Sequence, residues 1–173
     1  MNQELGLERL EKLGKHLLTG KLGHTVWNFN NWSAGERKEN GCGTNGCALG
    51  ECLVVFPKDW VAIKQGKGFF APILKEYGIA SDDPTGQSRI INSAMEYFGV
   101  SEREATHLFL PGCQLGEEDA LEGDATRGDA TRQEVGQAIL RFVAKKRKLA
   151  QVEIQGVVKK EREKIVLTKG DKA

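Results

Sequence analysis

Leucines recur at helical spacing in the first part of the chain, with charged residues between them, and this pattern predicts an amphipathic helix over residues 3–19. The apolar face of this helix comprises Leu7, Leu10, Leu13, Leu17 and Leu18. Gly20 and Gly23 end it, because glycine is the usual residue just past a helix C-terminus. Residues 26–32 place Trp27 and Phe29 on one side of an extended segment, which predicts a short strand or extended loop with buried rings.

Two consecutive helices are predicted from Gln87 to the region of Pro111. The first carries an apolar stripe of Ile90, Ile91, Ala94, Met95 and Phe98. Gly99 closes it as a C-terminal cap. The second opens with the capping box Ser101–Glu104, in which the serine and glutamate side chains satisfy each other's backbone amides.

A further capping box, Thr131–Glu134, predicts a helix whose apolar positions run through residues 135–143. Beyond Lys148 the pattern leaves three alternatives open. The chain can continue as helix, form a short strand around Val152 and Ile154, or fray as a tail.

The middle of the chain is less regular. Thr44 is a candidate cap for a helix from Asn45 to Phe56, which Pro57 would end. Gly46 and Gly50 disfavour helix in this stretch. Residues 59–70 alternate only loosely and contain two glycines, which indicates a short hairpin or an irregular connection.

These elements predict a mainly helical α+β fold in one globular domain, residues 1–148, with a small extended element near residues 27–32. A length of 173 residues with 39% hydrophobic content suits a single core. Residues 149–173 are predicted to form a basic C-terminal extension.

The charge is distributed unevenly along the chain. The net charge is only +1, yet residues 141–173 carry 11 of the 25 lysines and arginines and four of the 24 acids. This end can approach an acidic protein or nucleic-acid phosphates, although interleaved glutamates favour a solvated helical face as the alternative. We expect an unidentified protein partner first, and nucleic acid second. The residues predicted to contact nucleic acid are Lys145, Lys146, Arg147, Lys148, Lys159 and Lys160.

The sequence contains no stretch of about 18–20 apolar residues that could span a bilayer, and its first residues do not form a basic and apolar leader. We therefore expect a cytoplasmic protein that does not enter a membrane. In that compartment thiols stay reduced, which disfavours a disulfide framework.

The most specific motif is Cys42-Gly43-Thr44-Asn45-Gly46-Cys47-Ala48-Leu49-Gly50-Glu51-Cys52. Zinc needs about four ligands, and the chain has no second compact pair of cysteines, so we predict neither a metal nor another cofactor. On one helix Cys47 and Cys52 would lie about 140° apart around the axis, too far for a disulfide. A redox pair of Cys42 and Cys47 stays open.

A thiol at the start of a helix meets unpaired amides and the positive end of the helix dipole, which lower its pKa. Cys42 is therefore a candidate nucleophile, with His24 or His107 as base and Asn40 or nearby amides as oxyanion donors. This arrangement resembles papain-like peptidases and cell-wall amidases, although their spacing is shorter. His107 also fits a histidine at the edge of the core.

The remaining interpretation is structural, and it is the one we favour. Free cysteine behaves as a small hydrophobe, so we expect Cys47, Leu49, Cys52 and Leu53 in the core. Cys113 is expected to share that role.

The chain also resembles a group of small uncharacterised bacterial and bacteriophage proteins over about residues 5–145. The motifs that carry the resemblance are Phe29-Asn30-Asn31-Trp32, Cys42-Gly43-Thr44-Asn45-Gly46-Cys47-Ala48-Leu49-Gly50, Glu96-Tyr97-Phe98-Gly99-Val100-Ser101, Leu108-Phe109-Leu110-Pro111 and Thr131-Arg132-Gln133-Glu134-Val135. The resemblance implies no activity. Glu51-Cys52 departs from the group's pattern, which counts against a shared site of three thiols.

Three functions follow from these observations. The first is a non-enzymatic binding or accessory module of a bacterium, phage or mobile element. The second is a thiol-dependent hydrolase with Cys42 as nucleophile. The third is a zinc- or redox-linked nucleic-acid-binding protein that uses the basic end of the chain.

Overall fold

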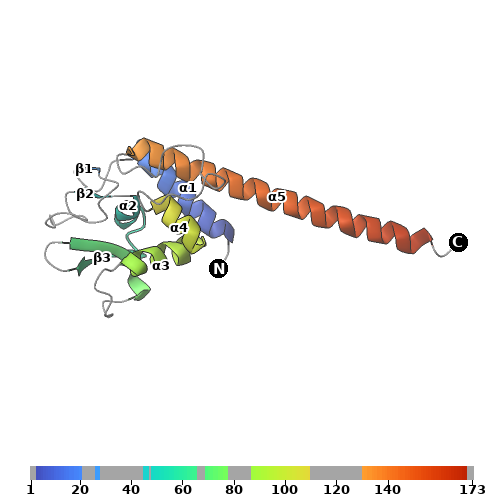
Figure 1. Cartoon of the computed structure of the whole chain (residues 1–173), viewed down its shortest axis with the longest axis horizontal. Helices are drawn as coiled ribbons and strands as arrows, with labels where there is room; N and C mark the ends of the chain where they lie inside the picture. Colours follow the sequence, from blue (N-terminus) through green and yellow to red (C-terminus); the bar gives the residue numbers. More distant parts are fainter. Residues whose placement is uncertain are drawn as a thin grey trace.

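The computed structural model describes residues 3–20, 26–27, 45–46, 48–65, 69–77, 87–109 and 130–170. These residues form a mainly helical α+β fold with a small antiparallel sheet, as predicted. Figure 1 shows a compact body and one long helix that leaves it.

Helix α1 (Gln3–Thr19) is the centre of the body and packs against α5, α2 and α3. Four leucines of its predicted apolar face are buried: Leu7, Leu10, Leu13 and Leu17. At Gly6 the helix lies directly on α3, because a Cβ there would fall on the backbone carbonyl oxygen of Phe98. The N-terminal end of α1 is therefore fixed against the C-terminal end of α3.

The predicted helix from Asn45 to Phe56 is wrong at its start. Asn45–Gly46 forms strand β2, which pairs in parallel with strand β1 (Val26–Trp27). Helix α2 begins at Ala48 and ends at Val55. Glycine is a poor helix former, and pairing with a distant strand satisfies this backbone instead.

A β-hairpin occupies the region for which the sequence left a hairpin or an irregular connection. Strands β3 (Trp60–Gln65) and β4 (Phe69–Leu74) are antiparallel, with Trp60 opposite Leu74. Pro72 lies inside β4, which a two-stranded sheet tolerates because each strand has a free edge. The hairpin packs on α3 and α2 and is followed by the short helix η1 (Lys75–Tyr77).

Helices α3 (Gln87–Phe98) and α4 (Glu102–Phe109) confirm the predicted pair and its caps. Gly99 ends α3 with a φ of 63°, a backbone conformation that favours glycine. In the capping box, the Ser101 amide donates to Glu104 Oε2 at 2.9 Å and the Glu104 amide donates to Ser101 Oγ at 3.3 Å. The aromatic rings of Phe56, Trp60, Tyr97, Phe98 and Phe109 form a continuous cluster in this part of the core.

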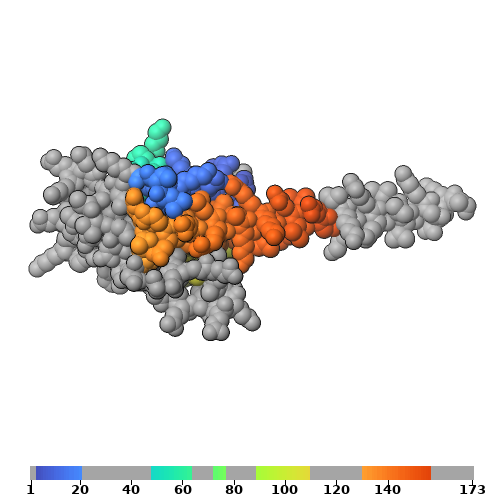
Figure 2. Space-filling view, turned by 90° about the horizontal axis from the view of Figure 1, so that it is seen from above, coloured from blue at the N-terminus to red at the C-terminus, as the bar shows by residue number. Residues whose placement is uncertain are grey.

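Helix α5 (Arg132–Gly170) has 39 residues and is therefore about 58 Å long. The predicted Thr131–Glu134 capping box opens it, with the Thr131 amide donating to Glu134 Oε2 at 2.7 Å. Its first half crosses α1 closely at Gly136, where a Cβ would lie 3.0 Å from the Gly14 carbonyl oxygen. Its second half projects away from the body (Figure 1), and the coloured part of that half in Figure 2, up to residue 156, already extends beyond the body.

The boundary predicted at residue 148 falls inside this one helix. Of the three alternatives for the chain beyond Lys148, the structure shows continued helix up to Gly170. We call residues 132–147 the anchored half of α5 and residues 149–170 the projecting half.

Candidate functional site

Of the four predicted catalytic residues, the described part of the chain contains His107; Cys42, His24 and Asn40 lie outside it. His107 is half-buried on α4, which packs against α3 and α5, and its Nδ1 atom is shielded from solvent. This is the position of a core-edge histidine, the alternative that the sequence left open.

The thiol segment enters the core where the structure describes it. Cys52 is fully buried on α2 with its Sγ 3.9 Å from the Ala48 carbonyl oxygen, and Leu49 is buried beside it. The predicted burial of Cys52 and Leu49 is therefore confirmed. Leu53 is partly buried against the same core, while Cys42, Cys47 and Cys113 lie outside the described residues.

A buried carboxylate–imidazole pair joins α1 to α2. Glu51 is 0% exposed in the first turn of α2, and its Oε2 lies 2.5 Å from Nε2 of His16 in the last turn of α1. Burying a carboxylate costs desolvation free energy unless a polar group hydrogen-bonds to it. The contact with His16 therefore offsets part of the desolvation cost of placing Glu51 in the core. Paired titratable groups in buried positions are frequent at functional sites.

This pair was not predicted from the sequence. The signal was a single glutamate inside the apolar segment from Ala48 to Phe56, at a position that a helix of this composition buries. Its partner is 35 residues away in the chain, and no local pattern connects the two.

The basic cluster at residues 145–148 is divided by the structure. Arg147 donates from Nε to Glu4 Oε1 at 2.9 Å and from Nη1 to Glu11 Oε2 at 2.6 Å, both on α1. Lys146 forms an ion pair with Glu104 of α4. Two of the four basic side chains of this cluster, out of six predicted to contact nucleic acid, therefore hold α5 to the body.

The pKa values of these groups reflect the contacts. Hydrogen bonds from Lys15 and Arg147 lower the pKa of Glu11 below its ordinary value. Burial raises the pKa of Glu104, but hydrogen bonds from Lys146 and from Ser101 outweigh it and leave that pKa lowered. Hydrogen bonds to Glu11 and Glu4 raise the pKa of Arg147. We call the contacts of Arg147 with Glu4 and Glu11, and of Lys146 with Glu104, the exit clamp, because they lie where α5 leaves the body.

Immediately past the exit clamp, α5 exposes large apolar side chains. Leu149 is 51% exposed, Val152 58% and Ile154 63%. Lys145 and Lys148 are also exposed, and Lys159 and Lys160 follow further along the helix. The projecting half thus combines apolar side chains with a basic sequence.

Among the residues that the structure describes, no group of three or more His, Cys, Asp or Glu side chains could hold a metal ion. Within the same part of the chain, no helix is long and apolar enough to cross a membrane.

Comparison with known proteins gives no family, curated protein or solved structure that matches this chain. The candidate sites are therefore defined by their geometry alone: the His16–Glu51 pair, and the projecting half of α5 with its exit clamp.

Proposed function

We propose that this protein is a non-enzymatic binding module. It docks the projecting half of α5 into a groove of a protein partner that has apolar side chains at its base and acidic side chains around it. The observation that carries the proposal is the exposure of Leu149, Val152 and Ile154, each more than half exposed, on a helix that has left the body. Most helical stability in proteins comes from packing of an apolar face. At about 100° per residue, Leu149 and Val152 share one face of α5, whereas Ile154 lies on another side of the helix. A groove that encloses the helix would supply the packing that the body does not give these side chains.

The charge of the projecting half favours an acidic partner. Residues 149–170 contain five lysines and arginines against three glutamates. Complementary charges steer association and select partners, while the buried apolar side chains supply most of the affinity. The basic excess also disfavours a second copy of the same helix as the partner, because like charges would face each other.

Nucleic acid is the weaker alternative as ligand. The exit clamp engages Lys146 and Arg147, which leaves Lys145 and Lys148 of the first basic cluster exposed. Binding to phosphates depends on basic side chains, and three exposed aliphatic side chains would not contribute to it. A groove on a protein would bury them.

The resemblance to small bacterial and bacteriophage proteins supports a bacterial or phage setting for this module, in the cytoplasm. It supports no particular partner.

The test compares two variants of the full chain. In the first, Leu149→Ser, Val152→Ser and Ile154→Ser remove the apolar side chains; in the matched control, Gln151→Ser and Gln155→Ser change two exposed polar residues of the same helix segment. A protein is captured with wild-type bait, purified and titrated against each variant. We expect the triple variant to bind at least ~10-fold more weakly, about 1.4 kcal/mol, with the control within about twofold.

Several results would contradict this proposal. They are equal binding of both variants, a captured partner that lacks an acidic surface, capture that nuclease treatment abolishes, and sedimentation of the isolated protein as a dimer that the triple variant dissociates. Each points to a different ligand or to a different surface.

One observation favours the hydrolase as a second candidate. A buried carboxylate that holds an imidazole is the arrangement that orients a general base, and Glu51 lies inside the cysteine motif, on α2. His16, which the sequence did not single out as a base, is therefore a histidine that a buried carboxylate orients.

The hydrolase is tested by thiol alkylation resolved by residue near neutral pH. It requires Cys42 to react far faster than the other cysteines, because the thiolate fraction sets the rate. It also requires His16→Ala to slow that reaction without unfolding the protein. Uniformly slow alkylation of all four thiols would eliminate this candidate.

A further inference from the structure

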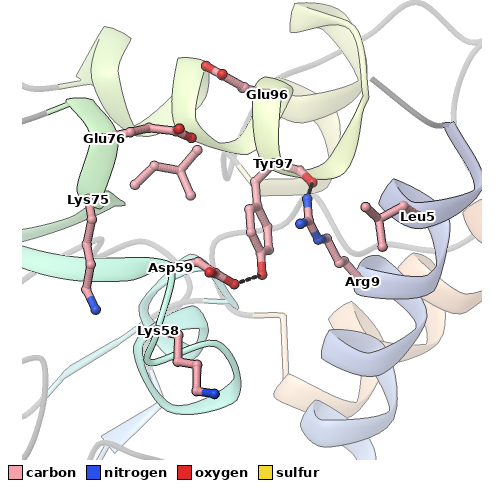
Figure 3. Close-up of a pocket in the computed structure, with 9 residues that line it drawn as sticks. Leu5, Arg9, Lys58, Asp59, Lys75, Glu76, Glu96 and Tyr97 are labelled. Atoms are coloured by element: carbon pink, nitrogen blue, oxygen red, sulfur yellow. Dashed lines mark hydrogen bonds between the residues drawn. The ribbon is translucent and has the colours of Figure 1, made fainter.

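A pocket of about 430 Å³ lies between α1, α3 and the end of β4, in the range of volumes that small-ligand sites occupy. Four parts of the fold contribute to it: the start of α1, the turn after α2, the end of β4 with η1, and the end of α3. Its lining residues, drawn in Figure 3, are Leu5, Arg9, Lys58, Asp59, Leu74, Lys75, Glu76, Glu96 and Tyr97.

Tyr97 stands at the centre of this pocket and links its two sides. Its hydroxyl donates to Asp59 Oδ2 at 2.6 Å, and the residue is 5% exposed. Burial, together with the hydrogen bond to Asp59, raises the pKa of Tyr97 above its ordinary value, so the phenol remains a neutral donor. Tyr97 thus fixes the direction in which the Asp59 carboxylate points and leaves Oδ1 able to accept another hydrogen bond.

The backbone of Asp59 is also fixed. Its amide donates to the Phe56 carbonyl at 3.0 Å, and its carbonyl accepts from the Lys75 amide at 2.9 Å. The side chain of Asp59 and both of its backbone groups are thus hydrogen-bonded. Its carboxylate is preorganised, which reduces the entropy lost when a ligand binds.

Arg9 is held over the face of the Tyr97 ring. Its guanidinium carbon lies 4.0 Å from the ring centroid, and Nη1 donates to the Tyr97 carbonyl oxygen at 2.8 Å. The remaining guanidinium donors can bind a carboxylate. Figure 3 shows the consequence: a fixed anion at the hydroxyl end of the Tyr97 side chain and a fixed cation over the face of its ring.

We propose that this pocket binds a small zwitterion, a free amino acid or a short peptide, with its ammonium group on Asp59 and its carboxylate on Arg9. A simple anion would meet Asp59, Glu76 and Glu96, and a simple cation would meet Arg9, Lys58 and Lys75. A molecule that carries both charges satisfies both sides. The apolar floor of Leu74 and the Tyr97 ring, with Leu5 41% exposed at the rim, suits an aliphatic side chain.

The test titrates the full-length protein with L-leucine and with the dipeptide Leu-Leu, followed by NMR or calorimetry. Leucinamide, N-acetylleucine and N-acetylleucinamide remove one charge or both. We expect the zwitterions to bind, with at least ~10-fold loss when either charge is removed. Comparison of leucine with Leu-Leu distinguishes the free amino acid from the short peptide.

Two variants locate the binding. Asp59→Asn removes the charge but keeps an acceptor for the Tyr97 hydroxyl, and we expect it to weaken binding at least ~10-fold with an unchanged fold. Arg9→Gln tests the other side independently. Glu8→Gln, an exposed neighbour on α1 that does not line the pocket, is the matched control and should bind as the wild type does.

Three results would overturn the proposal. They are no binding of either zwitterion up to ~10 mM, equal binding of the capped and uncapped ligands, and binding that both pocket variants leave unchanged. None of these results bears on docking by α5, which is tested with variants on another surface.

Discussion

The two halves of α5 have similar amounts of apolar sequence and opposite surroundings. In the anchored half, Val135, Ile139 and Val143 are at most 2% exposed. In the projecting half, Leu149, Val152 and Ile154 are more than half exposed, although the helix continues without interruption. The difference shows that apolar content alone does not bury a helix; a complementary surface has to be present, and α1 supplies one for the anchored half only.

The anchored half is held by two different kinds of contact. Close packing at Gly136 brings the backbones of α5 and α1 together near the start of α5. Ion pairs of the exit clamp hold the helix where it leaves the body. Packing depends on temperature and denaturant, and exposed ion pairs depend on pH and salt, so the two contributions can be separated.

The largest expected effect compares a buried glutamate with an exposed one. Glu51→Ala removes one partner of the buried carboxylate–imidazole pair and leaves a cavity, and we expect a loss of about 3–5 kcal/mol in the free energy of unfolding. Glu153→Ala, an exposed glutamate of the projecting half, should change it by less than about 0.5 kcal/mol. Urea denaturation measures both. Similar values for the two variants would mean that the body gains nothing from the His16–Glu51 contact.

The second comparison uses one residue type on one helix. Ile139 is 0% exposed and Ile154 is 63% exposed. Ile139→Ala should cost about 2–5 kcal/mol by loss of transfer energy and formation of a cavity, whereas Ile154→Ala should stay within about 0.5 kcal/mol. A cost above about 1 kcal/mol for Ile154→Ala in the isolated protein would show that the projecting half packs against something, a second copy being the first to examine by sedimentation.

The sequence predicted those parts of the fold whose signals are local. Helices α1, α3 and α4 and the start of α5 have apolar periodicity, and two of their starts have capping boxes that the structure confirms. The start of α2 was wrong, because residues 45–46 pair with a strand almost 20 residues earlier, and no local pattern announces that pairing. The length of α5 was also not predicted. The sequence beyond Lys148 fits a continued helix, a short strand and a frayed tail about equally well, and the structure shows the helix.

The candidate sites were less predictable for the same reason. Glu51 meets His16, and Arg147 meets Glu4 and Glu11 at the far end of the chain. Such pairs arise from the packing of α1 against two other helices, so they become visible only once the fold is known. The sequence pattern presents residues 145–148 as one basic cluster, and the division into clamp residues and exposed lysines was not predicted.

The third prediction concerns the exit clamp. Glu11 and Glu104 have lowered pKa values in the folded protein, so they bind protons less readily than in the unfolded chain. Their contribution to stability is therefore fully present above the unfolded pKa, about 4.3, and is lost as the pH falls through the folded value. We expect Lys146→Met with Arg147→Met to lower the melting temperature at pH 7, by less than Ile139→Ala does, and to have little effect near pH 3.

Lys145→Met with Lys148→Met is the matched control, because it removes the same charge from the exposed neighbours. High salt should reduce the difference between the clamp variant and the wild type. An equal fall in melting temperature for both double variants would assign the effect to net charge instead of to the clamp.

The smallest expected effect on the body comes from the largest change in the chain. Removal of residues 149–173 deletes the projecting half of α5, in which none of residues 149–156, the part whose side chains the structure describes, is buried. Since the buried side chains of the body supply most of the stability, the melting temperature should shift by no more than about 2–4 °C, while the far-UV circular dichroism loses the helix of the projecting half. A larger fall would mean that the body depends on this half, and α5 would then be a structural element instead of a docking helix. An unchanged melting temperature together with full loss of partner binding would separate the two halves by function as well as by surroundings.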